Sequence, residues 1–128
     1  MRIEHVALCV KNLECSREFF EKYFAARSSG LYCNPKTGFS SYFLSFEDGT
    51  RLELMSYSDI ADVRGKNAHT MGYAHIAFSV GSRGEVNALT ERLKEDGFCI
   101  VGEPRVTGDG YFESVVADLE GNLIEITV

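Results

Sequence analysis

His5-Val-Ala-Leu-Cys-Val10 stands near the start of the chain, and the same pattern returns as His75-Ile-Ala-Phe-Ser-Val80. A second block is also repeated: Asp48-Gly-Thr-Arg-Leu-Glu53-Leu54 corresponds to Glu120-Gly-Asn-Leu-Ile-Glu125-Ile126. In both copies of this block the last glutamate follows its glycine by four positions. Both blocks recur after nearly the same number of residues, and this indicates an internal duplication.

Each half shows the same order of expected elements. Alternating apolar residues predict a first strand over about 3–10 and again over about 73–80. A helix with a single apolar stripe follows in each half. The later expected strands cover about 41–47 and 50–56, and then about 98–102, 111–117 and 122–128.

We therefore expect an α+β fold in which two tandem βαβββ modules form a curved mixed sheet. The modules cover about 1–56 and 73–128, with a linker over about 57–72, and together they make one domain over residues 1–128. Asp48-Gly49 predicts a tight hairpin turn, and Gly97 predicts the end of the second helix. The stretch 107–113 could line a pocket, but we favour a turn followed by a strand whose Tyr111 packs.

The composition narrows the classes of partner and compartment. The 128 residues carry a net charge of −6, which disfavours nucleic acids and anionic membranes as partners. No stretch approaches the ~20 apolar residues of a membrane span, and no cleavable signal precedes the first strand. The cysteines at 9, 15, 33 and 99 lack CxxC spacing, so we expect reduced thiols and a cytoplasmic protein.

Four residues within the repeated blocks fall on one side of their strands. Successive side chains alternate between the faces of a strand, and the apolar residues of these strands are expected to pack under the helices. This places His5, Glu53, His75 and Glu125 on the opposite, non-helix face. If the sheet curves, the four side chains converge in a trough.

Two imidazoles and two carboxylates suit a divalent transition metal. Carboxylates supply negative charge, and imidazoles select against calcium and magnesium. A lone histidine or glutamate on a strand is usually an ordinary surface residue, but the duplication places the same two residue types on the same face in both halves. We therefore predict one divalent metal per site, with nickel or zinc first and cobalt, manganese or iron as alternatives. His69 has no counterpart in the repeat and is assigned no role.

These blocks resemble the vicinal oxygen chelate superfamily, which includes glyoxalase I, bleomycin-resistance proteins, extradiol dioxygenases and fosfomycin-resistance thiol transferases. Within it, a His/Glu/His/Glu ligand set is most similar to glyoxalase I (lactoylglutathione lyase). That resemblance implies a small-molecule lyase reaction of the kind used to detoxify methylglyoxal: the hemithioacetal of a 2-oxoaldehyde and a thiol becomes a 2-hydroxyacyl thioester. The carriers of the resemblance are His5-Val-Ala-Leu-Cys-Val, Phe19-Phe-Glu-Lys-Tyr23, Arg51-Leu-Glu53-Leu, Gly72-Tyr-Ala-His75-Ile-Ala and Asp118-Leu-Glu-Gly-Asn-Leu-Ile-Glu125-Ile.

The resemblance also implies roles for the four residues and a homodimeric assembly. Glu125 is the first candidate for the base that removes a proton next to a carbonyl, with Glu53 serving the opposite stereochemistry, while His5 and His75 act as ligands only. Cys9 stands where glyoxalase I often has an arginine that binds glutathione, so another thiol stays open. A thiol transferase, a dioxygenase or a non-enzymatic protein that binds an antibiotic or metabolite are the alternatives.

Overall fold

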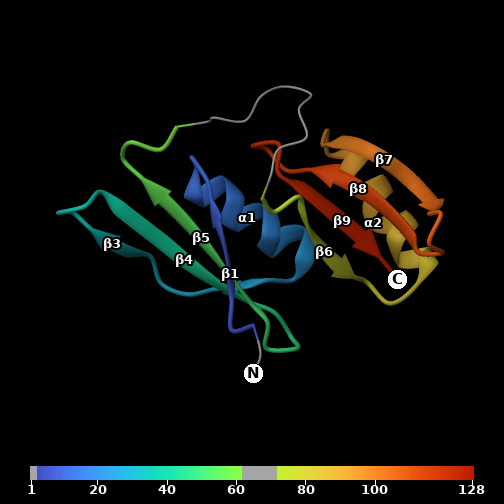
Figure 1. The fold of residues 1–128 in the computed structure, drawn as a ribbon, viewed down its shortest axis with the longest axis horizontal. Helices are drawn as coiled ribbons and strands as arrows, with labels where there is room; N and C mark the ends of the chain where they lie inside the picture. The colour runs from blue at the N-terminus through green and yellow to red at the C-terminus, as the bar shows by residue number, and fades with distance from the viewer. Residues whose placement is uncertain (1–2, 62–71) are drawn as a thin grey trace. The chain divides into compact units, whose positions relative to one another are not determined.

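The computed structural model describes residues 3–61 and 72–128 and divides the chain into two compact units, residues 1–63 and 64–128. Each unit contains one helix and one sheet (Figure 1). Most of the predicted linker over 57–72, together with His69, lies outside the described residues. The two units are therefore described one at a time.

The first unit builds its sheet around a central antiparallel pair of strands. Strand β1 pairs in parallel with β5, β5 pairs antiparallel with β4, and the short strands β2 and β3 both pair with β4. The sequence analysis anticipated β1, β4 and β5 but not β2 and β3. The elements are β1 (Val6–Cys9), α1 (Leu13–Phe24), β2 (Arg27–Ser28), β3 (Tyr32–Asn34), β4 (Phe39–Ser45) and β5 (Arg51–Tyr57).

The second unit repeats this plan with four strands. Strand β6 pairs in parallel with β9, which pairs antiparallel with β8, and β8 pairs antiparallel with β7. The shared order of a parallel edge strand, a helix and an antiparallel set confirms the expected α+β class and its duplicated plan. The elements are β6 (His75–Ser79), α2 (Arg83–Glu95), β7 (Cys99–Val106), β8 (Phe112–Ala117) and β9 (Leu123–Thr127).

Each helix covers one face of the sheet in its own unit. Helix α1 packs on β4 and β5, where Phe20, Leu44 and Leu54 are fully buried. Helix α2 packs on β7, β8 and β9, with a buried core that includes Leu93 and Ile126. Removing these apolar side chains from water is the main force that holds helix to sheet. Neither helix has the length and hydropathy that a membrane-crossing helix needs.

Local signals in the sequence agree with the turns in most places. Gly49 and Gly97 have φ of 85° and 87°, values that glycine adopts without steric cost, and they lie where the hairpin turn and the helix end were expected. A turn also precedes β8, where the amide of Gly110 donates to the carbonyl of Thr107 over 3.0 Å. The expectation that Tyr111 packs is wrong: the residue is 59% exposed, because it lies just before β8 begins.

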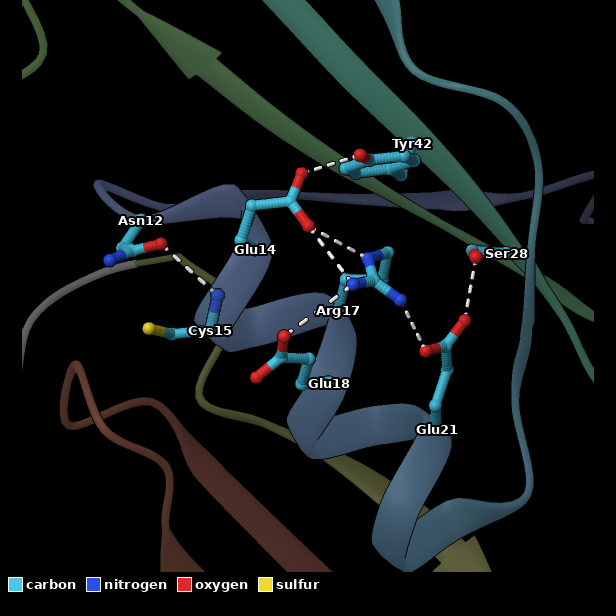
Figure 2. Close-up of polar contacts among 8 residues, drawn as sticks. All are labelled: Asn12, Glu14, Cys15, Arg17, Glu18, Glu21, Ser28 and Tyr42. Carbon is cyan, nitrogen blue, oxygen red and sulfur yellow. Dashed lines mark hydrogen bonds and ion pairs between the residues drawn. The ribbon is translucent and has the colours of Figure 1, made fainter.

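A cluster of polar side chains links α1 to the strands beside it (Figure 2). The Tyr42 hydroxyl on β4 donates to Glu14, and Arg17 binds Glu14 over 3.0 Å. The Ser28 hydroxyl on β2 donates to Glu21 over 2.6 Å. The hydrogen bond from Tyr42, followed by that from Arg17, lowers the pKa of Glu14, and the same bond raises the pKa of Tyr42.

Candidate metal centre

In the first unit, His5 and Glu53 lie side by side on the face of the sheet that α1 leaves open. The parallel pairing of β1 with β5 sets Ala7 beside Glu53, and His5, two positions before Ala7, faces the same side. The imidazole Nε2 of His5 lies 3.7 Å from Oε2 of Glu53. The Glu53 side chain is only 14% exposed, so its carboxylate is held within the face rather than extended into solvent.

The other ring nitrogen of His5 is also engaged. Nδ1 of His5 contacts the Glu4 carboxylate, and Glu4 in turn forms an ion pair with Arg51. The hydrogen bond from His5 is the largest cause that lowers the pKa of Glu4. The Phe43 and His5 rings meet edge-on, with their centroids 5.3 Å apart. The guanidinium carbon of Arg51 lies over the Phe43 ring, 4.5 Å from its centroid. These contacts fix the ring so that Nε2 faces Glu53.

In the second unit, His75 and Glu125 repeat this arrangement. The parallel pairing of β6 with β9 sets Ala77 beside Glu125, as Ala7 stands beside Glu53 in the first unit. Nε2 of His75 lies 3.4 Å from Oε2 of Glu125, whose side chain is 18% exposed. Each unit thus brings together the histidine and the glutamate that the repeated blocks singled out.

Sequence reasoning included Glu113 only as the end of the stretch 107–113 that could line a pocket, and it gave no separate role to this second acidic residue on the open face of the second unit. It lies on β8, pairs across the strands with Thr127 and is 9% exposed, so it shares the sheet face of Glu125. Burial, followed by the neighbouring Glu125 carboxyl, raises the pKa of Glu113, and Arg105 at 3.8 Å opposes that rise. Glu113 has no acidic counterpart in the first half, so the search for repeats passed over it.

The donor atoms fit a metal ion. Two ligands bound at 2.0–2.2 Å to one ion lie roughly 3.0–3.5 Å apart, close to the separations within the two His–Glu pairs. The contact of Glu4 with Nδ1 of His5 is the kind of outer partner that metal-binding histidines commonly have. Within residues 3–61 and 72–128, however, no group of three or more potential ligands gathers. Each unit supplies a pair, and the predicted four-residue set needs both pairs.

A cavity of about 530 Å³ in the first unit is separate from this pair. It opens between the start of α1 and the adjoining ends of β4 and β5, and neither His5 nor Glu53 lines it. Its lining combines lysine, hydroxyl and amide groups with one carboxylate, Glu14, and it includes no imidazole. The lining residues are Lys11, Asn12, Leu13, Glu14, Gly38, Ser40, Ser56, Tyr57 and Ser58.

Comparison with known proteins assigns the chain to a family. Residues 2–126 match the Glyoxalase/Bleomycin resistance protein/Dioxygenase superfamily, and because this match spans nearly the whole sequence, the chain belongs to that superfamily. The resemblance seen in the repeated blocks is thereby confirmed. A comparison with curated proteins gives no match.

Solved structures with the same fold include proteins described as glyoxalases. A possible glyoxalase from Bacillus cereus is 28% identical, with a TM-score of 0.73 over 100% of this chain and 99% of that one. Glyoxalase I from Leishmania major, described as trypanothione-dependent, is 22% identical, with a TM-score of 0.79 over 99% of this chain and 86% of that one. Glyoxalase I from Zea mays is 20% identical, with a TM-score of 0.77 over 98% of this chain, which spans only 44% of the maize protein.

Proposed function

We propose that this protein is a metal-dependent lyase of the glyoxalase I type, with His5, Glu53, His75 and Glu125 as its metal ligands. The observation that carries the proposal is the repetition of one facing pair, an imidazole Nε2 against a carboxylate Oε2, on the open sheet face of each unit. One such pair could be a chance neighbour on a strand. The same pair at the same register position in two units favours a shared task.

The chain's own residues account for ligand binding and for proton transfer. Contact of Nδ1 of His5 with the Glu4 carboxylate favours the tautomer whose Nε2 lone pair is free for a metal. When bound, the metal supplies Lewis-acid stabilisation of the two neighbouring oxygens of the substrate. Glu125 takes the proton from the carbon that bears the thiol sulfur, and the proton is returned to the neighbouring carbon, which was the carbonyl carbon, while the hydroxyl proton passes from one oxygen to the other. Glu53 takes or returns the proton for the opposite stereochemistry. His5 and His75 hold the metal and transfer no proton.

The proposed substrate is the hemithioacetal of a 2-oxoaldehyde and a thiol, and the product is a 2-hydroxyacyl thioester. Nickel or zinc is the first choice of metal, since two imidazoles and two carboxylates with room for substrate oxygens suit a five- or six-coordinate ion. We further propose that the protein works as a cytoplasmic homodimer. The glyoxalases among its structural neighbours support the reaction class, while the identity of the thiol is part of the test.

The test reconstitutes the metal-free protein separately with nickel, zinc, cobalt and manganese, and assays each form with methylglyoxal and glutathione. Formation of the thioester in a metal-dependent manner supports the proposal. The same assay is repeated with trypanothione and with a small monothiol. The reason is that Cys9 stands where glyoxalase I often has an arginine that binds glutathione. Metal binding without turnover on any of the three thiols would rule out the glyoxalase reaction.

Glu53→Gln separates the proposal from its closest alternatives in the same superfamily. A glyoxalase-type site uses the Glu53 carboxylate, so this variant should lose both metal affinity and turnover. If metal binding instead needs only His5, His75 and Glu125, a thiol transferase or a dioxygenase becomes the better description. Oxygen consumption by the iron-loaded protein would then indicate the dioxygenase. A chain that binds none of the metals would be a non-enzymatic binding protein.

A further inference from the structure

Three aromatic side chains gather on the open face of the first sheet, farther along β5 than Glu53. Tyr57 lies four positions beyond Glu53 and pairs across the strands with Phe39, so both rings share the face of Glu53. Tyr32 pairs with Ser41, two positions after Phe39, and therefore faces the same side. The ring centroids of Phe39 and Tyr57 lie 5.1 Å apart, and those of Tyr32 and Phe39 lie 6.0 Å apart. We call these three residues the aromatic cluster.

The rings of the aromatic cluster pack on one another but stay open to solvent. Tyr32 is 55% exposed and Tyr57 is 38% exposed. Ser41, by contrast, is only 3% exposed, although it stands on the same face between Tyr32 and Met55 in the register. Its larger neighbours therefore close over the strand and form a continuous surface. Aromatic surface of this kind gains free energy when an apolar group covers it.

The stretch of sheet that joins Glu53 to the aromatic cluster is uncharged. The exposed Cys9 of β1 pairs with Met55, which lies halfway between Glu53 and Tyr57 on the open face. The open-face positions of β3, β4 and β5 beyond Glu53 are Tyr32, Asn34, Phe39, Ser41, Met55 and Tyr57. None of them carries a charged side chain, and Arg51 lies on the other side of Glu53. At ~3.3 Å per residue, the cluster begins roughly 13 Å along the strand from Glu53.

We propose that the aromatic cluster binds an uncharged apolar group at the far end of the substrate thiol, while the reacting oxygens lie at Glu53. This inference rests on the proposed function, because it takes the face of Glu53 as the substrate face, and it names the class of thiol. The uncharged surface runs without a break from Glu53 over Met55 to the cluster, so one extended apolar chain can cover all of it.

The same surface disfavours a thiol that carries several carboxylates. Such a thiol would lose hydration of its charges on this part of the face without meeting a cation among the open-face residues there. The substrate class is therefore the hemithioacetal of a 2-oxoaldehyde and a long apolar thiol. A small monothiol shares the reacting atoms of that substrate but lacks the group that the cluster holds.

The experiment uses the cobalt-loaded protein and three hydroxamate probes, whose two neighbouring oxygens take the place of the substrate oxygens. Acetohydroxamate has no tail, the phenyl probe has a phenyl group at the end of an octanoyl chain, and the carboxylate probe has a carboxylate at the end of the same chain. Changes in the cobalt absorption spectrum give the affinity for each. The phenyl probe should bind about 10–100-fold more tightly than the carboxylate probe, as burial of one aromatic group predicts.

Variants of Tyr57 assign this preference to the aromatic cluster. Tyr57→Ala should reduce the preference by about 3–10-fold, because one ring contact with the phenyl group is lost. Tyr57→Phe keeps the ring and should keep the preference. Tyr111→Ala is the matched control, since it removes an exposed tyrosine from the second unit, and it should match the parent. Circular dichroism of each variant identifies any loss that comes from misfolding.

The outcomes separate this inference from the proposed function. If the parent binds acetohydroxamate at its metal but shows no preference for the phenyl probe, the inference is overturned and the proposed function stands. Full preference in Tyr57→Ala would also overturn it. If that variant keeps the preference but changes the oligomeric state in sedimentation velocity, a second copy of the chain covers the cluster, and the inference fails. A parent chain that binds no metal overturns both.

Discussion

At the scale of single residues, the neighbours of His5 set the orientation of its ring. Nδ1 meets Glu4, Nε2 faces Glu53, and the ring edge rests against Phe43. A ligand whose ring is already oriented loses less conformational freedom when a metal binds, so affinity rises without any additional bond. Glu4 is thus expected to act on the metal site without touching the ion.

Glu4→Ala should weaken metal binding at least about 10-fold, because the His5 ring and its tautomer lose their outer partner. Equilibrium titration with zinc checks this result. Glu47→Ala is the matched control, since Glu47 is also an exposed acid of the first unit but lies in the turn between β4 and β5. Equal affinity in the Glu4→Ala variant and the parent would show that Glu4 does not orient His5.

The paired ligands could be predicted from the sequence because each occurs twice in matching surroundings. Glu4 and Glu113 could not be found in this way. Both are acids on or beside a strand, a pattern typical of solvent-exposed residues, and neither has an acidic counterpart in the other half of the chain. The contact of Glu4 with His5 and the strand register that sets Glu113 on the face of Glu125 appear only in the folded chain.

At the scale of elements, the attachment of α1 to β4 includes a charged hydrogen bond between Glu14 and Tyr42 (Figure 2). Tyr42→Phe should lower the free energy of unfolding at neutral pH. The pKa of Glu14 in the folded chain lies below its ordinary value of 4.5, so its stabilising contribution is present above that pH and is lost as the pH falls through the lowered pKa. The difference between variant and parent should therefore shrink in acid.

Urea unfolding of both chains at several pH values from neutral to acid measures this effect. Tyr57→Phe, which removes a hydroxyl from an exposed tyrosine of the same unit, should show no such trend. If the free energy of unfolding of Tyr42→Phe stays equally far below that of the parent at the lowest pH, the difference comes from packing of the ring and not from the bond to Glu14.

The turn that leads from β3 into β4 depends on Gly38. Its φ is 67°, and a Cβ atom there would lie 2.2 Å from Oγ of Ser58. Gly38→Ala should lower the free energy of unfolding by more than about 1 kcal/mol, since both the backbone and the neighbouring side chain must shift. Gly30→Ala is the control, because a Cβ there meets nothing within 4 Å. Thermal unfolding of the two variants gives the comparison, and equal stability would contradict the account of this turn.

The helices and the longer strands could be predicted because their apolar residues recur with a clear period. Strands β2 and β3 could not, since runs of two and three residues are too short for alternation to appear. The exposed Tyr111 shows a related limit: a hydrophobic pattern predicts a strand nearby, but the turn before β8 decides whether the first aromatic residue belongs to it.

At the scale of the whole molecule, the chain is one plan used twice, with a His–Glu pair at the matching place in each use. The duplicated sequence blocks indicated the family and the α+β fold, and the family match agrees. The proposed function also depends on the duplication, because neither His–Glu pair alone supplies enough ligands for the metal. A site built from both pairs should respond to the loss of a ligand from either unit. This is the central claim of the account.

Elemental analysis of the untagged protein, purified without chelator, tests that claim most directly. We expect about one metal ion for each set of His5, Glu53, His75 and Glu125. Loss of that metal is expected on His5→Ala as well as on His75→Ala, with both variants folded as judged by circular dichroism. Full metal content in either variant would contradict a site shared by the two pairs, and the absence of metal from the parent after incubation with nickel, zinc, cobalt and manganese would contradict the site altogether.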